Sequence, residues 1–306
     1  MNEKWFVIIN PVSGGKKGPK LWHKIKPLLD EGGISYEFGI TEFIDHASQL
    51  VKSAIEKQFI NFLVIGGDGT ANDVVNGIMQ SGTDPQQITI AMLAAGTGND
   101  WVRTIGKYKS LQEIISSLNN KKTFLHDVGL VSFQKNGSTH KRYFINIVGL
   151  GFEGHVAKKL SESNGILNGT KLQYQVAILR SLFLYHHTNM KITVDGKTSE
   201  HKTLSIACGI CKYNGGGLKQ LPDAMYDDGF LDMTLIGSMS KFKMAVSLPK
   251  LKDGSHTKMH EVLTFKGKEF LIESTPPVFI DADGEYLGET TVKIELEEKC
   301  LNIMSW

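Results

Sequence analysis

Gly66-Gly67-Asp68-Gly69-Thr70 is the stretch that decides the fold of this 306-residue chain. The apolar residues 62–65 before it predict a buried strand, and residues 71–78 after it predict a helix with one apolar face. Glycines at such a turn let the backbone take positive φ and let a ligand approach closely. Because the first N–H groups of a helix suit a phosphate, the stretch predicts a phosphate-binding loop rather than a plain surface turn.

Asp68 stands in the middle of this loop, where a site that binds only anions has no use for an acid. A carboxylate fits there if it holds Mg²⁺ beside the phosphates, or if it accepts a proton from an attacking hydroxyl. The loop therefore predicts ATP and Mg²⁺ as cofactors of a phosphoryl transfer.

Strand and helix signals alternate over residues 1–125, which we expect to form one domain. The predicted strands are 6–9, 35–40, 62–65 and 88–93, and the predicted helices are 21–29, 46–57, 71–78 and 111–118. This alternation predicts a doubly wound parallel sheet, in which ligands bind at the carboxyl ends of the strands. Polar, glycine-rich turns follow three of the strands, at 10–15, 66–70 and 96–100. We expect these turns to converge on one crevice.

The strand signals in residues 126–296 predict a second, β-rich domain, which we expect to be an antiparallel sandwich. The predicted strands are 124–133, 141–148, 190–194, 203–211, 229–236, 262–265, 269–273 and 292–296, with one helix near 171–185. The last segment, 297–306, is expected to join the first domain. The fold class is therefore α/β plus β.

Composition bounds the function further. The net charge of +2 and the pI near 8.2 are too weak to predict a nucleic-acid partner. No apolar run is long enough to span a bilayer and no signal peptide opens the chain, so we expect a cytoplasmic protein. Cys208 and Cys211 lack a second cysteine pair, which favours buried free thiols over zinc.

A Gly-x-Gly-x-x-Gly pattern occurs at 149–154, after a predicted strand. The pattern alone suggests dinucleotide binding. However, a dinucleotide-binding fold also needs a second parallel strand that carries a ribose-binding acid, and none follows here. We interpret it as a structural turn. The chain also lacks the G-x-x-x-x-G-K-[ST] pattern of P-loop enzymes.

The three turns together resemble the diacylglycerol kinase family of lipid kinases, and the resemblance covers nearly the whole chain. The Gly66–Thr70 signature is also shared by NAD kinases and phosphofructokinases, whose fold it implies for the first domain. The more discriminating match is Gly96-Thr97-Gly98-Asn99-Asp100. The resemblance implies that ATP is bound by Asn10, Pro11, Ser13, Gly14, Thr41, Gly66, Gly67, Asp68, Gly69, Thr70, Asn72, Gly96, Thr97 and Asn99.

In the second domain, Gly215-Gly216-Gly217 and the segment 222–229 resemble the family's metal loop. The resemblance implies that Asp228 holds a structural Mg²⁺ together with the backbone carbonyls of Met225 and Phe230, which is a reasonable donor set for a hard cation. On spacing alone the loop is an ordinary β-turn.

Asp283-Gly284-Glu285 is similar to the family's Asp-Gly-Glu motif, whose glutamate is the proposed general base. A carboxylate within reach of an attacking hydroxyl suits that role. On spacing alone the same residues are a hairpin turn with a solvated acid. Asp127 is a weaker hypothesis, as a supporting acid near a cleft between the domains.

These observations predict an ATP- and Mg²⁺-dependent kinase of phospholipid metabolism, with Asp68 and Glu285 as catalytic residues in an interdomain site. The acceptor is diacylglycerol or a related lipid; phosphatidylglycerol, a sphingoid base and ceramide stay open. Residues 174–185 predict either a cover for an acyl chain, a contact with a membrane surface, or a packed helix. The alternatives are an NAD kinase and a non-catalytic nucleotide or lipid binder. The resemblance is also compatible with a homodimer.

Overall fold

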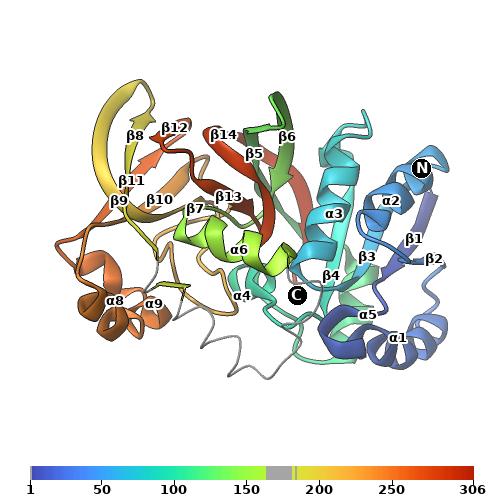
Figure 1. Cartoon of the computed structure of the whole chain (residues 1–306). Helices are drawn as coiled ribbons and strands as arrows, with labels where there is room; N and C mark the ends of the chain where they lie inside the picture. Colours follow the sequence, from blue (N-terminus) through green and yellow to red (C-terminus); the bar gives the residue numbers. More distant parts are fainter. Residues whose placement is uncertain (1, 163–180, 183–184) are drawn as a thin grey trace. The chain divides into compact units, whose positions relative to one another are not determined.

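The computed structural model describes residues 2–162, 181–182 and 185–306 (Figure 1). The chain divides into two compact units: unit 1 comprises 1–128, 226–228 and 297–306, and unit 2 comprises 129–225 and 229–296. The predicted helix at 171–185 lies almost wholly outside the described residues. Among the residues that are described, no helix is long and apolar enough to cross a membrane.

Unit 1 is built on a parallel sheet with the strand order β2-β1-β3-β4-β14. Its strands are β1 (Asn2–Ile9), β2 (Tyr36–Ile40), β3 (Phe59–Gly66), β4 (Thr89–Ala94) and the end of β14 (Glu285–Met304). β14 contributes through Asn302 and Ile303, which pair with Thr89 and Ile90 of β4. The predicted α/β sheet is confirmed.

Helices cover both faces of this sheet (Figure 1). On one face, Ile25 and Leu29 of α1 (Ser13–Glu31) and Ile114 of α5 (Leu111–Asn120) share an apolar cluster with Val7 of β1. On the other face, α3 and α2 pack so closely that a methyl group on Gly77 would lie 2.8 Å from the Ser48 carbonyl oxygen. The remaining elements are α2 (His46–Glu56), α3 (Asp68–Met79), α4 (Asp100–Ile105) and a 3₁₀ turn (Pro85–Gln87).

Unit 2 contains six strands that close on themselves in the order β7-β9-β8-β12-β14-β13. They are β7 (Ile147–Gly151), β8 (Thr188–Val194), β9 (Lys197–Gly209), β12 (Phe270–Thr275), β13 (Phe279–Ala282) and β14. The predicted antiparallel domain is present, but these strands form a barrel where we expected a sandwich. The difference arises because β8 pairs with both β9 and β12, and alternation along a strand cannot reveal such closure.

Other elements attach to the outside of the barrel. β10 (Leu231–Gly237) and β11 (Val262–Gly267) extend β9, while β5 (Thr123–Lys135) pairs with β14 and with β6 (Ser138–Phe144). The predicted strand 141–148 is therefore two strands, β6 and β7. The helices are α6 (Phe152–Glu162), α8 (Lys241–Ser247), α9 (Lys250–Asp253) and a 3₁₀ turn (Ser255–Lys258).

Candidate functional site

The three glycine-rich turns of unit 1 meet backbone to backbone, as predicted from their positions at strand ends. A methyl group on Gly14 would lie 2.0 Å from the Ala95 carbonyl oxygen, and one on Gly67 would lie 3.0 Å from the Cα of Gly96. Asn10 Nδ2 donates to Thr70 Oγ1 at 2.9 Å and ties the first turn to the second. Glycine is therefore required here for close approach between the turns.

The first turn is irregular, because Gly14, Gly15 and Lys16 all have positive φ at the start of α1. We expect Gly14→Ala to lower the free energy of unfolding by about 3 kcal/mol, since it adds a clash to left-handed strain. Gly15→Ala is the matched control, because its added methyl group would meet nothing within 4 Å. Strain alone then costs about 1 kcal/mol. Urea unfolding measures both values, and equal losses would contradict the close packing of the turns.

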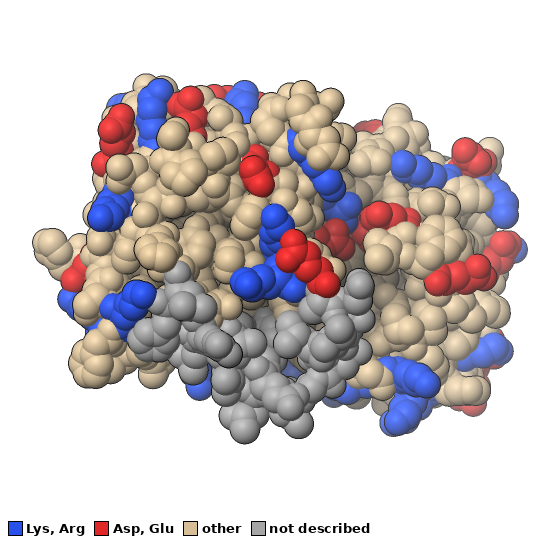
Figure 2. All heavy atoms as spheres, viewed as in Figure 1, with Lys and Arg blue, Asp and Glu red and all other residues tan. Residues whose placement is uncertain are grey.

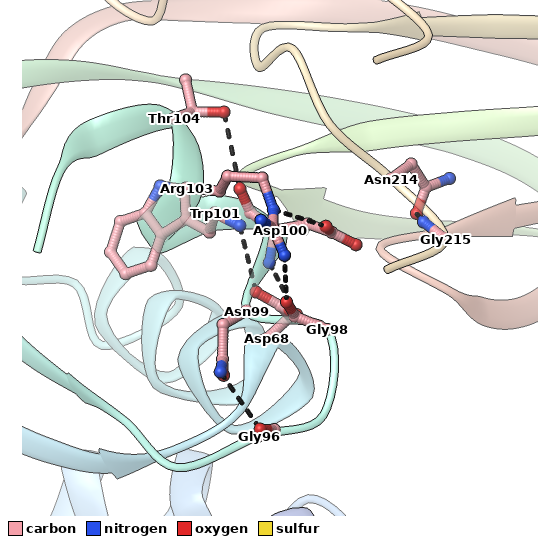
Figure 3. Close-up of polar contacts among 10 residues, drawn as sticks. All are labelled: Asp68, Gly96, Gly98, Asn99, Asp100, Trp101, Arg103, Thr104, Asn214 and Gly215. Atoms are coloured by element: carbon pink, nitrogen blue, oxygen red, sulfur yellow. Dashed lines mark hydrogen bonds and ion pairs between the residues drawn. The ribbon is translucent and has the colours of Figure 1, made fainter. Parts of the chain in front are cut away.

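Asp68 begins α3, and both of its carboxylate oxygens accept hydrogen bonds from the start of α4 (Figure 3). Oδ2 accepts from the Asp100 N–H and Oδ1 from the Trp101 N–H, each at 3.1 Å. Asp68 therefore caps α4, a structural role that sequence reasoning did not foresee. Each oxygen retains a further lone pair for a cation or a hydroxyl.

The turn between Asp68 and α4 is held by its own side chains (Figure 3). Asn99 Nδ2 donates to the Gly96 carbonyl oxygen at 3.1 Å, and Arg103 Nη2 donates to the Gly98 carbonyl oxygen at 3.2 Å. Arg103 also lies 3.6 Å from Asp100 Oδ1 while its side chain remains 45% exposed. This places a cation beside the third turn, and we did not predict it because a single arginine in a short helix carries no motif.

A buried chain of aromatic contacts continues from Asp68 through unit 1. Trp101 Nε1 donates to His126 Nε2 at 3.1 Å, and the His126 ring stacks on Tyr226 with 5.1 Å between centroids. Burial lowers the pKa of His126 to about 4, so this imidazole stays neutral at physiological pH. Asp127 is fully buried, and its Oδ1 accepts from the Lys299 N–H at 2.7 Å. It therefore anchors the C-terminal segment.

The other residues predicted to bind ATP differ in exposure. Thr97 is exposed, and Pro11, Ser13 and Gly69 are half-buried on the turns. Thr41 is 8% exposed and its N–H donates to the Ile9 carbonyl oxygen at the end of β1. Asn72 is only 1% exposed, and its Oδ1 accepts from Asn76 Nδ2 at 3.0 Å. The Asn72 side chain is thus engaged inside α3, so the structure does not present it at the surface of the turns.

In unit 2, Asp283 and Gly284 form the predicted hairpin turn between β13 and β14, both with positive φ. The Asp283 carboxylate accepts hydrogen bonds from the N–H groups of residues 145, 146 and 147 at 2.9–3.1 Å. These bonds hold the turn against the start of β7. Glu285 follows at once, and its Oε2 lies 2.8 Å from Arg142 Nη2 of β6. Arg142 orients this carboxylate. Arg142 was not predicted, because it lies too far from Glu285 in the sequence for any motif to connect the two residues.

The predicted metal loop stays a prediction. Among the described residues, no three His, Cys, Asp or Glu side chains lie close enough to hold a metal ion. A cation at Asp228 would therefore depend on backbone carbonyls, as the prediction requires. Met225 and Phe230 are 51% and 38% exposed, and the Phe230 ring has Lys266 Nζ 5.5 Å and Lys268 Nζ 5.6 Å from its centroid.

The Gly-x-Gly-x-x-Gly pattern at 149–154 is structural. β7 runs antiparallel to both β9 and β13, unlike the parallel strand of a dinucleotide-binding fold. Gly154 lets α6 approach β13, since a methyl group there would lie 2.1 Å from the Phe279 carbonyl oxygen. Cys208 and Cys211 are buried thiols outside any disulfide, as predicted.

Unit 2 contains a partly open cavity of about 230 Å³, lined by residues of α6, α8, α9 and the strands β9 and β10. A single water needs only about 10–15 Å³ by this measure, so the cavity can hold a ligand. Its wall is mostly apolar and includes Leu160, Leu182, Leu204, Ile236, Met239, Met244, Leu248, Leu251, Met259 and Val262. Gly284, which directly precedes Glu285, also lines it. The cavity therefore reaches the residue that precedes the candidate base in sequence.

Two acids, Glu153 and Asp281, are among the polar residues that line this mostly apolar cavity. Both point at Gly149, where a methyl group would lie 2.4 Å from Asp281 Oδ1 and 2.7 Å from Glu153 Oε2. Glu153 Oε1 accepts from Gln220 Nε2 at 2.9 Å. Burial raises the pKa of Asp281 to about 8, and burial followed by the Asp281 charge raises the pKa of Glu153. Sequence reasoning missed this pair.

The raised pKa of Asp281 makes folding depend on pH. The folded protein keeps a proton that the unfolded chain releases above about pH 4, so stability is lost as the pH rises from about 4 to 8. We expect Asp281→Asn to raise the free energy of unfolding by about 2 kcal/mol more at pH 8 than at pH 5. Urea unfolding at both pH values checks this, with the exposed Glu200→Gln as control. A gain independent of pH would contradict it.

Comparisons with known proteins fit this geometry. Residues 4–131 match the model for the diacylglycerol kinase catalytic domain, and residues 146–305 match that for the YegS C-terminal NAD kinase beta sandwich-like domain. The chain is 29% identical to the Bacillus subtilis protein named "Putative lipid kinase YtlR", over 98% of each chain. It is 26% identical to a Mycobacterium tuberculosis diacylglycerol kinase, over 97% of this chain and 93% of that protein.

Solved structures share the fold. A Bacillus anthracis diacylglycerol kinase structure superposes with a TM-score of 0.71 at 23% identity, covering 99% of this chain and 97% of that one. A yeast NADH kinase complexed with NADH superposes with a TM-score of 0.55 at 13% identity, covering 98% and 82%. At these identities the two structures support the two-domain α/β plus β fold alone.

Proposed function

Because the chain belongs to the diacylglycerol kinase catalytic domain family, we propose that it transfers the γ-phosphoryl group of ATP to the hydroxyl of a lipid. Unit 1 binds the nucleotide on its three converging turns, and unit 2 binds the acceptor. The observation that carries the proposal is the apolar cavity of unit 2, whose wall includes the residue before Glu285. An apolar cavity suits the acyl chains of a lipid better than a polar acceptor.

The nucleotide part of the proposal is supported by unit 1. The start of α3 and the backbone of the turns offer N–H groups to phosphate oxygens, and Arg103 adds a positive charge near Gly98. Asp68 is held by two N–H donors, which leaves it oriented for a cation or an attacking hydroxyl. The ATP-binding set is that named from the sequence, apart from Asn72, which we propose supports α3.

The chemical step is an in-line displacement at the γ-phosphorus. The lipid hydroxyl oxygen bonds to phosphorus, its proton passes to the Glu285 carboxylate, and the bond to the bridging oxygen of ADP breaks. Arg142 keeps Glu285 in position at 2.8 Å. Mg²⁺, when bound, neutralises part of the charge on the phosphates. Asp68 is the residue proposed to position it, while Asp228 with the carbonyls of Met225 and Phe230 would hold a structural ion.

The acceptor class is the finer part of the proposal. Diacylglycerol or a related lipid presents a hydroxyl next to acyl chains, which matches an apolar cavity with an acidic patch. NAD phosphorylation is the alternative, and a non-catalytic binder is a third. Offering a lipid and NAD together to the protein with labelled ATP tests all three, because the label identifies the acceptor.

A further inference from the structure

We infer that the outer face of α8 and α9 docks on an anionic lipid bilayer. We define this α8–α9 face by Phe242, Val246 and the lysines at 241, 243, 250, 252 and 258. The inference deepens the proposed function, since the bilayer is where a lipid acceptor would be found, and it can be tested without any phosphoryl transfer.

The first observation is an exposed apolar pair on α8. Phe242 is 77% exposed and Val246 is 56% exposed. Because they are four residues apart, the two side chains lie on the same side of the helix. Met244 is only 4% exposed and packs inward with Leu182 and Leu204. The helix is therefore apolar on both faces, whereas a surface helix of a water-soluble domain normally turns polar residues outward.

The second observation is the charge of the segment that carries this pair. Residues 238–260 contain five lysines and one aspartate, although the whole chain carries a net charge of only +2. Lys243 is offset by an ion pair with Glu261, and Lys250, Lys252 and Lys258 still outnumber Asp253. Exposed aromatic and aliphatic side chains among lysines are the pattern of a helix that lies in the interface of an anionic membrane.

The third observation is that the same helices wall the apolar cavity of unit 2. Met244, Ser247 and Leu248 of the α8 segment and Leu251 of α9 line it. Figure 1 shows α8 and α9 side by side, with β10 and β11 leading to and from them. One layer of helix thus separates the proposed membrane contact from the cavity. A bilayer is the partner that explains apolar surface on both sides of this layer.

A second exposed apolar pair provides a contrast. Phe43 and Ile44 of unit 1 are 55% and 83% exposed. They stand between Glu42 and Asp45, without a lysine in residues 39–48. Anionic lipid would repel these carboxylates. Exposure of apolar side chains alone therefore does not single out the α8–α9 face. Its combination with lysines and with the cavity wall does.

The test is co-sedimentation of the full chain with vesicles of phosphatidylglycerol and phosphatidylcholine in equal parts, without ATP. We expect Phe242→Glu/Val246→Glu to lower the vesicle partition coefficient at least about tenfold. Ile44→Glu is the matched control and should leave it unchanged. A second variant, Lys250→Gln/Lys252→Gln, should lower it by about fivefold per lysine and reduce its salt dependence. Circular dichroism confirms that each variant is folded.

Three results would overturn the inference. The first is wild-type vesicle binding by the Phe242→Glu/Val246→Glu variant, and the second is equal binding of the unaltered protein to anionic and neutral vesicles. The third is an oligomer that the same variant dissociates, which would assign the face to a second copy. The proposed function can fail independently of this inference. If the protein does not phosphorylate any lipid, its binding to vesicles can still be measured and is still expected.

Discussion

Glu285→Gln is expected to lower kcat for lipid phosphorylation about 10³-fold, while the dissociation constant for ATP stays within about twofold. The glutamine has nearly the same shape and cannot accept the proton of the attacking hydroxyl. It also retains an oxygen toward Arg142, so the hairpin and the strand β14 should fold as before. Steady-state kinetics at saturating ATP measure the first quantity, and calorimetric titration of ATP measures the second.

Glu289→Gln is the matched control for this prediction, because Glu289 is an exposed acid on the same strand four residues further on. It should leave kcat unchanged. If Glu285→Gln turned over lipid at close to the wild-type rate, Glu285 would not be the base. The Asp283-Gly284-Glu285 segment would then have only a structural role, as the hairpin turn between β13 and β14.

Asp68→Ala is expected to abolish measurable turnover, a loss of more than about 10³-fold, and also to lower the free energy of unfolding by about 2 kcal/mol. The stability loss follows because the N–H groups of Asp100 and Trp101 lose their acceptors at the start of α4. Asp68→Asn separates the two roles. Its amide oxygen can still accept one N–H, so stability should largely recover, whereas activity should stay low because the negative charge is gone.

Asp84→Asn is a control that matches the capping role. The Asp84 side chain accepts from the Gln86 N–H at the start of the short 3₁₀ turn, outside the three glycine-rich turns. It should cost a little stability and no activity. Chemical denaturation and initial rates, measured on the same preparations, give both values. An Asp68→Asn variant with full activity would show that Asp68 acts only as the cap of α4.

The sequence predicted the parts of the fold that depend on short-range patterns. Buried strand, glycine turn and amphipathic helix recur along unit 1, and each recurrence places a turn at the same sheet edge. The convergence of these turns, seen in the contact between Gly14 and Ala95, follows from that rule. The Asp283-Gly284 hairpin was likewise readable, because few residues other than Asp-Gly suit two successive positive φ angles.

The barrel and its cavity could not be predicted from short-range sequence patterns. Closure depends on β8 pairing with β9 and β12 at once, and nothing in strand alternation specifies two partners. The acidic pair had no signal either. Glu153 sits in a pattern that resembles a dinucleotide motif, and Asp281 precedes a motif that draws attention to Asp283 and Glu285. Only folding brings the two carboxyl groups over Gly149.

Some site residues were missed because their partners lie far away in sequence. Arg142 meets Glu285 across 143 positions, and His126 meets Trp101 through a buried hydrogen bond that no motif marks. Asp68 was predicted from its loop as a catalytic carboxylate that holds Mg²⁺ or accepts a proton, but its capping of α4 requires the third turn to be in place. Two of these contacts hold Glu285 and Asp68, which the family resemblance had already identified.

The most direct test of the central claim is transfer of label from γ-labelled ATP, with Mg²⁺, in mixed micelles that contain diacylglycerol, phosphatidylglycerol, a sphingoid base or ceramide, with NAD added to each. We predict that label appears in one of the lipids, that NAD stays unlabelled, and that Asp68→Asn and Glu285→Gln each abolish the transfer. Transfer of label to NAD would contradict the account. Transfer of label to a lipid at the wild-type rate by both variants would also contradict it.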